Sequence, residues 1–583
     1  MRKWWLVIVG ALLIAGGSYL AHRIQTSGGT TITDVRFPGD KGVSMSGLLY
    51  VPPQATARRP APAVLVSHGY INTREMQSAF AIELARRGFV VLAMDMTGHG
   101  NSGSAVGQQG FGGPAALKYL RSLPMVDKAN IGMEGHSLGG APILTAAFLA
   151  PDDYKSMVLE GSTPGLFGAP GGGSPTFPKN LAVVFGQYDE FANVMWQTPK
   201  GVDIVSTPKL KALFGTSDKV VADRIYGDMA AGTARMLVQP PVTHPAEHFS
   251  AAGVTPAVDW FQKTLEGETT PLPPEDQIWF WKEVGTLLGF LGMVVLMLGT
   301  FDVLLGLAPF RALATLAEPV VERRDRKWWL AFGLTTAIPA LTFIPFMKAG
   351  ALFFPMKLFP QYITNNLVVW ALLNVAVTLV LGLVLTGPKA RFDKKVVPGV
   401  LIAVATLAAG YLSLVAVDAL FKVDYRFWVL GLKPLDATHA GYVAAYILPF
   451  LAFYLVSLRS LHSRLAVRGE GAFSQYLTAA LAMSLGFIVL LGVQYASLFA
   501  TGLLAIPSEP LNTIIAIQFV PLGMVVGVIA AFTYRRTNSN LPGALICALL
   551  ITWYVVAGTA THWHADFKLP GAAPAKVSEP REP

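Results

Sequence analysis

Eight apolar runs, each about as long as a membrane-crossing helix, occupy the second half of this 583-residue sequence. A soluble protein would need far more polar surface than this chain has to bury them, because hydrophobic residues make up 52% of it and mean hydropathy is +0.47. We therefore expect residues 281–562 to form an all-α transmembrane domain of about eight helices. The runs are centred near Leu296, Ile338, Val377, Thr406, Ile447, Val489, Val525 and Leu550.

A further apolar run opens the chain. Arg2 and Lys3 precede a hydrophobic stretch from Trp4 to about Ala21, as in an export signal. Tyr19, two positions before Ala21, matches poorly the small residues of a cleavage site, and the run is nearly long enough to span a bilayer. We predict that residues 1–25 are an uncleaved signal anchor, which brings the spans to nine, with cleavage as the alternative.

The basic residues indicate an orientation. They cluster in every second connection between the apolar runs, whereas the intervening loop at 500–510 has Glu509 as its one charged residue. By the positive-inside rule these basic connections are cytoplasmic, together with Arg2 and Lys3. The sequence therefore predicts a multi-pass protein of the cell membrane, with the region between the first two spans and the tail, residues 563–583, outside the cytoplasm. The basic connections are 322–327, 389–395, 459–468 and 535–536.

These connections also account for the net charge of +9. No basic stripe is interleaved with aromatic residues, so we expect no nucleic-acid partner. The single cysteine, Cys547, lies in an apolar run and excludes an intrachain disulfide; we expect it to be a small core residue.

Three amides fall inside the predicted spans: Asn374, Gln494 and Gln518. A polar group in a membrane is costly, so each is a candidate functional residue. Single amides also hold transmembrane helices together, and we favour that interpretation. Asp302 and Asp418 lie near span ends, where hydration is easy. The transmembrane domain could be an anchor, a lipid-facing substrate channel or a transporter.

Residues 30–270 have the composition of a soluble α/β domain, and a linker, residues 271–280, follows at Pro271, Pro273 and Pro274. Eight short β-branched runs alternate with helical stretches. They predict strands at 31–37, 43–51, 63–67, 89–95, 131–134, 157–160, 181–185 and 236–240.

A nucleophile elbow follows the fifth predicted strand. The segment Gly135-His136-Ser137-Leu138-Gly139-Gly140 leads directly into an apolar helix at 141–149. In a strand-turn-helix context, Gly-x-Ser-x-Gly holds a strained serine above the sheet at a helix N-terminus, where an oxyanion is favoured. Ser137 is therefore the predicted nucleophile.

With these motifs, residues 31–265 resemble the α/β-hydrolase superfamily, in its dienelactone hydrolase and prolyl-oligopeptidase-like branch. The resemblance implies an eight-stranded, mostly parallel sheet. The segment Val66-Ser67-His68-Gly69-Tyr70 follows the third strand as the oxyanion loop does in this family, which implies an oxyanion hole made by the backbone N–H groups of Tyr70 and Leu138. The segment 98–103 also matches G-x-G-x-x-G, but no helix is predicted after it, so we expect no nucleotide site.

The acid and the base each have two candidates. Asp189 follows the seventh predicted strand, where the family places its carboxylate; Asp218 lies at a more usual distance from the histidine, but a predicted helix at 208–213 precedes it. His244 and His248 both follow the eighth strand. The distance to the aromatic end of the last helix favours His244, which would leave His248 at the rim of the site.

The sequence thus predicts a membrane-bound serine hydrolase that cleaves an ester or related acyl bond through Ser137, His244 and Asp189. Its expected partners are a small-molecule or lipid acyl substrate and membrane lipids. No zinc-ligand spacing, phosphate loop or haem signature occurs, so no metal or other cofactor is expected. The alternative is a multi-span transporter with an extracytoplasmic hydrolase-like binding or regulatory domain.

Overall fold

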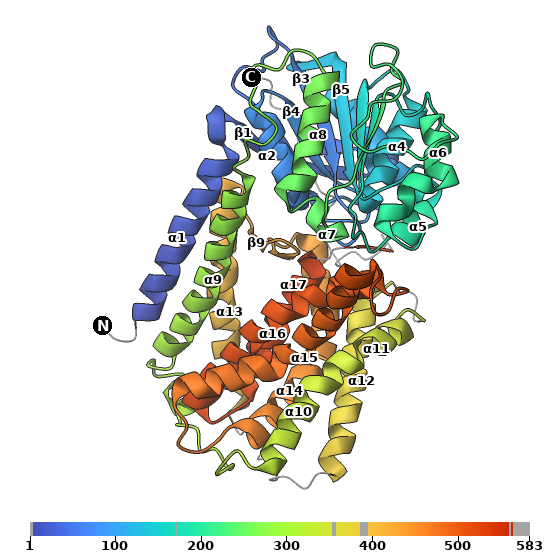
Figure 1. Ribbon diagram of the computed structural model, residues 1–583. Coiled ribbons are helices and arrows are strands. Elements are labelled where there is room, and N and C mark those ends of the chain that lie inside the picture. The colour runs from blue at the N-terminus through green and yellow to red at the C-terminus, as the bar shows by residue number, and fades with distance from the viewer. Residues whose placement is uncertain (1–3, 171, 353–356, 385–394, 559–560, 564–583) are drawn as a thin grey trace.

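The computed structural model describes residues 4–170, 172–352, 357–384, 395–558 and 561–563. Arg2, Lys3, most of the basic connection 389–395 and the predicted tail beyond residue 563 lie outside these ranges. The chain forms an amino-terminal domain, residues 31–270, which sits on one end of a helical domain made of α1 and the elements from α9 to α17 (Figure 1).

The amino-terminal domain is built on one eight-stranded sheet with the order β1-β2-β4-β3-β5-β6-β7-β8. β1 and β2 pair antiparallel, β2 pairs antiparallel with β4, and the remaining neighbours are parallel. All eight predicted strands are confirmed, with ends that differ by a few residues. They are β1 (Thr31–Pro38), β2 (Ser44–Val51), β3 (Ala61–Ser67), β4 (Val90–Asp95), β5 (Val126–His136), β6 (Ser156–Glu160), β7 (Leu181–Val184) and β8 (Arg235–Val238).

Helices cover both faces of this sheet. Along β3, Leu65 packs into the core beneath α3 (Gly113–Ser122) and α4 (Gly140–Leu149), whereas its neighbour Val64 packs beneath α2 (Ser78–Arg86) and α8 (Ala251–Thr264). Successive side chains of a strand point to opposite faces, and both faces are buried here, which explains the continuous apolar runs of the central strands. Three short helices complete the domain: α5 (Ala192–Trp196), α6 (Pro208–Phe214) and α7 (His244–Glu247).

The helical domain contains the apolar runs. Among the described residues, eight helices are long and apolar enough to cross a membrane, and a bent pair, α10 with α11, would make nine. This composition indicates a membrane protein. The elements are α1 (Trp5–Gln25), α9 (Trp279–Leu304), α10 (Arg326–Leu341), α11 (Phe343–Gly350), α12 (Tyr362–Val384), α13 (Val396–Phe421), β9 (Tyr425–Phe427), β10 (Leu430–Leu432), α14 (Ala437–Leu465), α15 (Ala472–Thr501), α16 (Pro510–Thr537) and α17 (Leu541–Gly558).

The run near Ile338, predicted to be a span, contains a bend. It forms α10 and α11, which meet at an angle of 42°. Pro339 lies in the last turn of α10, where its ring removes a backbone donor and crowds the preceding turn. The break follows at Thr342, whose hydroxyl donates to the Ile338 carbonyl at 2.7 Å.

Glycines set the close packing of α1 on α9. A Cβ added at Gly17 would lie 2.5 Å from the carbonyl oxygen of Gly285, and one at Gly292 would lie 2.8 Å from the backbone nitrogen of Ile14. Small residues allow two transmembrane backbones to approach in this way. α1 is therefore packed as an integral part of the helical domain.

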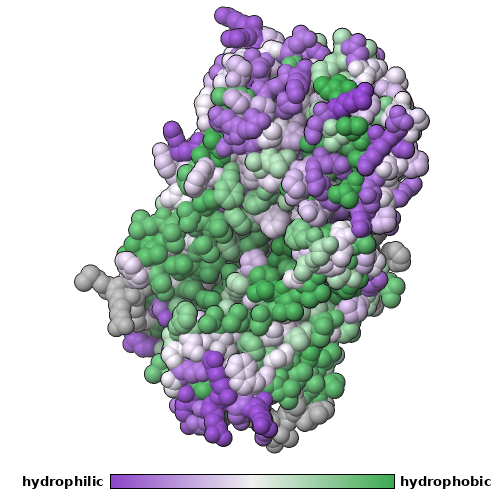
Figure 2. All heavy atoms as spheres, viewed as in Figure 1, coloured by the Kyte–Doolittle hydropathy of each residue, from purple (hydrophilic) through white to green (hydrophobic). Residues whose placement is uncertain are grey.

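The charges lie at the two ends of the helical domain. Figure 2 shows a hydrophobic band between the hydrophilic amino-terminal domain and a second hydrophilic surface at the far end. Two ion pairs at that far end join connections that are distant in sequence: Arg324–Glu470 at 2.7 Å and Arg468–Glu322 at 2.8 Å. Residues from two of the basic connections predicted to be cytoplasmic thus lie together, on the side opposite the amino-terminal domain.

The three intramembrane amides bond to neighbouring groups. Gln494 donates to the Thr513 hydroxyl at 2.9 Å, Asn374 accepts from Thr342 at 3.2 Å, and Gln518 accepts from the Tyr554 hydroxyl. Each bond joins two helices, as expected of helix-helix glue. Asp302, near a span end, is partly exposed and pairs with Arg536 at 3.1 Å, and Cys547 is buried.

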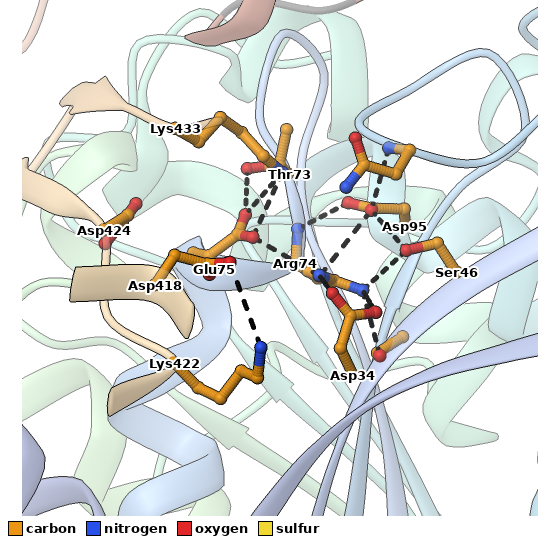
Figure 3. Close-up of polar contacts among 12 residues, drawn as sticks. Asp34, Ser46, Thr73, Arg74, Glu75, Asp95, Asp418, Lys422, Asp424 and Lys433 are labelled. Carbon is orange, nitrogen blue, oxygen red and sulfur yellow. Dashed lines mark hydrogen bonds and ion pairs between the residues drawn. The ribbon is translucent and has the colours of Figure 1, made fainter. Parts of the chain in front are cut away.

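Buried charges join the two domains. Glu75, which follows β3, lies between Lys433 of the helical domain, at 3.0 Å, and Arg74, at 3.3 Å; Arg74 in turn pairs with Asp34 at 2.7 Å (Figure 3). Burial alone would raise the pKa of Glu75, but Lys433 and the neighbouring arginines hold it well below its usual value. The carboxylate is therefore ionised and fully paired across the interface.

Candidate active site

Ser137 lies on the tight turn between β5 and α4. Its φ is +54°, a strained conformation for a residue with a side chain. The flanking glycines permit the turn, because a Cβ at Gly135 would lie 2.3 Å from the Gly139 carbonyl oxygen. Ser162 donates to the Ser137 carbonyl at 2.7 Å and holds the turn from below. The local geometry is that of the predicted elbow.

Asp189 and His244 are brought together although 55 residues separate them: His244 Nδ1 lies 2.8 Å from Asp189 Oδ2. Asp189 follows β7, and its other oxygen accepts from the Phe191 backbone at 2.6 Å. Burial acts to lower the pKa of His244, but the Asp189 carboxylate, its hydrogen bond and the charge of Glu190 raise it above the usual value. This arrangement fixes the ring with a proton on Nδ1 and leaves Nε2 as the basic atom.

The two alternative residues differ in position. Asp218 is exposed, and its backbone N–H bonds to Thr216. His248, expected at the rim, lines the same cavity as Ser137 and His244, but its side chain is buried, with Nδ1 facing His136 Nδ1 at 3.2 Å. Burial and the neighbouring His244 lower the pKa of His248 to about 3, so it is neutral. Sequence spacing missed this because the α7 turn folds both histidines inward.

The predicted oxyanion residues lie in the same cavity as Ser137: Tyr70 and Leu138 both line it. His68 supports the Tyr70 loop. Its Nδ1 donates to the Gly69 carbonyl at 2.8 Å while Nε2 accepts from the Met96 backbone at 3.2 Å. Burial lowers the pKa of His68, which keeps the neutral ring that both bonds require.

This cavity, of about 610 Å³, has walls from both domains. The amino-terminal domain contributes Ser137, His244 and the apolar side chains of Phe167, Phe191 and Val194. Phe191 and Val194 belong to the segment that follows Asp189. The opposite wall was not predicted, since nothing in the local sequence of a transmembrane segment marks it as facing a distant serine. It consists of Val429, Ser508, Glu509, Pro510, Leu511, Asn512, Ile514, Gln518 and Trp563.

The helical domain also bonds to the segments that carry the acid and the base. Tyr495 of α15 donates to Glu190 at 2.9 Å, and the other oxygen of Glu190 accepts from the His244 backbone N–H at 2.8 Å. Trp428, between β9 and β10, donates to the Pro245 carbonyl at 3.0 Å. Burial and the adjacent Asp189 raise the pKa of Glu190 to about 7.

Three carboxyl groups, Glu134, Glu160 and Glu247, are buried beneath the site. Burial raises the pKa of each well above the usual value. Glu247 accepts from the Gly186 backbone at 2.6 Å and lies 3.4 Å from His136 Nε2. Glu247 thus joins the loop after β7 to the short helix that begins at His244.

His136, His244 and Glu247 are close enough to be considered as metal ligands, with all three ligand atoms within 4.8 Å of one another. The hydrogen bonds argue against that use. His136 Nε2 faces the His244 carbonyl at 3.1 Å and His244 Nδ1 faces Asp189, so both nitrogens carry protons. The arrangement does not fit a metal.

The G-x-G-x-x-G segment wraps around a carboxylate. Asp95 accepts from the Asn101 backbone at 3.0 Å, and a Cβ at Gly100 would lie 2.2 Å from Asp95 Oδ1. A phosphate there would meet a buried negative charge, which agrees with the expectation that the segment is not a nucleotide site.

Comparison with known proteins bears on the amino-terminal domain. Residues 62–208 match the family model described as the alpha/beta hydrolase fold. The amino-terminal domain has the α/β-hydrolase fold. An uncharacterized protein of Escherichia coli (strain K12), YcjY, is 31% identical over 114 residues, which is 18% of this chain and 37% of YcjY. The chain thus spans little more than a third of the length of that relative.

Two solved structures are similar to this domain. A bacterial heroin esterase is 16% identical, with 43% of this chain and 89% of the esterase covered and a TM-score of 0.33. A dienelactone hydrolase from Anabaena variabilis is 19% identical, with 41% of this chain and 99% of the hydrolase covered and a TM-score of 0.29.

Proposed function

We propose that this protein is a membrane-embedded serine hydrolase that cleaves an ester or related acyl bond. One observation carries the proposal. The 2.8 Å contact between His244 and Asp189 lies at a cavity that Ser137, on its strained elbow, also lines. Nucleophile, acid and base follow one another along the chain in the order that this fold requires.

In the proposed reaction, Ser137 Oγ attacks the acyl carbonyl while His244 Nε2 takes its proton. The backbone N–H groups of Tyr70 and Leu138 stabilise the oxyanion, and Asp189 stabilises the imidazolium that forms. His244 then gives the proton to the leaving alcohol, and an acyl-Ser137 ester remains. Water, deprotonated by His244, attacks this ester, releases the acid and restores the serine.

We also propose that the amino-terminal domain lies outside the cytoplasm. The joined basic connections at the far end of the helical domain support this orientation through the positive-inside rule. It is tested in a Cys547→Ser background with single cysteines at the exposed positions Ser217 or Thr315. An impermeant maleimide should label Ser217→Cys in intact cells and Thr315→Cys only after lysis; the opposite pattern would place the reaction in the cytoplasm.

The test of the chemistry is covalent labelling by a fluorophosphonate, which reacts only with an activated serine. We expect labelling of the detergent-solubilised protein, loss of labelling in Ser137→Ala and unchanged labelling in the matched control Ser217→Ala, at an exposed position. A protein that acts solely as a transporter with a hydrolase-like binding domain would leave the reagent unreacted. Labelling that persists in Ser137→Ala would refute the assignment of the nucleophile.

A further inference from the structure

We infer that the substrate is a membrane lipid. Its long acyl chain binds along α16 of the helical domain and is transferred to Ser137. This rests on the proposed function and names its substrate class. The inference starts from the composition of the cavity: a transmembrane helix forms the wall that faces the nucleophile.

The first turns of α16 provide that wall. Pro510, Leu511 and Ile514 line the cavity with Ser137, and Leu511 is only partly buried, so its side chain borders open space. From the other side, Phe191 and Met195 line the same cavity. An acyl chain attached to Ser137 would therefore lie between apolar side chains of both domains. The volume of about 610 Å³ is within the range of roughly 300–1,000 Å³ that suits an organic ligand.

α16 continues from this cavity to a second one. Gln518 lines the Ser137 cavity, while Phe519 and Leu522, within the next turn, line a further cavity of about 100 Å³ inside the helical domain. Ile514, Gln518 and Leu522 are spaced by four residues and so share one face of the helix. The side-chain oxygen of Gln518 accepts a hydrogen bond from the Tyr554 hydroxyl, so this oxygen has a partner even beside a hydrocarbon chain. α16 thus borders both cavities as it runs from the amino-terminal domain into the helical domain (Figure 1).

The cavity is also bordered by apolar side chains at the level where the helices end. Phe167 and Val194, which line it, are 70% and 56% exposed. Nearby, exposed Phe499 near the end of α15 packs against Tyr188 with ring centroids 5.2 Å apart. In Figure 2 the hydrophobic band of the helical domain reaches the base of the hydrophilic domain. A lipid could enter from that band without passing its chain through water.

Burial of a chain in such a site predicts how the rate depends on length. Each methylene that moves from water into the site stabilises the transition state and raises kcat/KM by up to about fourfold. Lengthening the acyl chain from four to eight carbons should therefore raise kcat/KM about 10²-fold. A shallow polar site would show no such slope.

The experiment measures kcat/KM of the detergent-solubilised full chain for p-nitrophenyl esters of four to twelve carbons. Leu511→Trp fills the wall beside the serine and should lower the ratio of dodecanoate to butyrate hydrolysis at least tenfold. The matched control is Met524→Trp on the same helix, exposed and outside both cavities; it should keep the wild-type ratio. Proteoliposomes of dioleoyl phosphatidylethanolamine and phosphatidylglycerol that also hold dioleoylglycerol should release oleate.

A flat chain-length profile that Leu511→Trp leaves unchanged, or a failure to release oleate from these proteoliposomes, would overturn the inference. If fluorophosphonate still labels Ser137 and butyrate is still cleaved, the proposed function survives that result. Absence of both labelling and butyrate hydrolysis would refute the proposed function itself.

Discussion

The two domains meet at one cavity but contribute to it in different ways. The amino-terminal domain supplies Ser137, Asp189 and His244, each at or after the carboxyl end of a strand, where short loops fix side chains on a rigid sheet. The helical domain supplies apolar walls and hydrogen bonds to the loops around Asp189 and His244. Under the proposed function, reactivity would depend on loops of the sheet, whereas the choice of substrate would depend on elements hundreds of residues away in the sequence.

The largest expected effect comes from substituting His244, and the comparison is with His248, the other buried histidine that follows β8. His244→Ala should lower kcat about 10⁴-fold or more, because loss of a triad member leaves only binding and the oxyanion hole. His248→Ala should lower it far less, since His248 contacts His136 rather than Asp189. Ester hydrolysis by the two purified variants provides the measurement, and the reverse ranking would make His248 the base.

The acid gives the second largest effect. Asp189→Asn should lower kcat about 10⁴-fold by permitting the wrong histidine tautomer. Asp218→Asn, at an exposed position, is the matched control and should retain wild-type kcat. Equal losses in both variants would contradict the assignment.

A third prediction concerns the charges between the domains. Lys433→Met removes the cation that pairs with the buried Glu75 carboxylate from the helical domain, and we expect a loss of about 3 kcal/mol of stability at neutral pH. Folding lowers the pKa of Glu75. The ionised carboxylate therefore stabilises the fold at pH values above its ordinary pKa, and this stabilisation is lost as the pH falls through the folded pKa. The loss in Lys433→Met should therefore shrink in acid.

The measurement is the thermal unfolding midpoint in detergent at pH 7 and pH 4. The matched control is Lys155→Met, which removes a pair with the exposed Glu266 and should cost about 0.5 kcal/mol or less. An unchanged unfolding midpoint in Lys433→Met would show that the domains are held by their apolar contacts alone.

The smallest predicted effect tests the influence of the membrane side on the base. Tyr495→Phe removes a hydrogen bond to Glu190 and should lower kcat/KM about threefold to tenfold. The ionised Glu190 raises the pKa of His244, and a Tyr495 hydrogen bond favours that ionised form. Its removal should therefore lower the pKa of His244, so that the acid limb of the pH profile moves to lower pH.

Tyr476→Phe, on the same helix but bonded to Arg536 at 3.4 Å instead, serves as control. Its pH profile should match the wild type. A shift of equal size in both variants would point to a general change in α15.

The sequence predicted those parts of the molecule that depend on short patterns. The elbow at Ser137 could be predicted because glycine spacing and the preceding strand are local features, and strand order favoured Asp189, which the structure places 2.8 Å from His244, over Asp218. The burial of His248 was missed because it depends on how α7 packs. The cavity wall at Leu511 and the bond from Tyr495 to Glu190 could not be predicted, because both arise from contacts between segments more than three hundred residues apart. Tyr495 and Glu190, for example, are separated by 305 positions.

The glycine contacts between α1 and α9 bear on how the chain is made. In the order of synthesis α1 precedes the amino-terminal domain and α9 follows it. In the proposed orientation α1 therefore stays in the bilayer without its partner while that domain crosses the membrane. If α1 is the predicted signal anchor, the same helix first directs export and later packs its backbone against α9. Cleavage after α1 would remove the helix that covers the glycine face of α9, so we expect α1 to be retained.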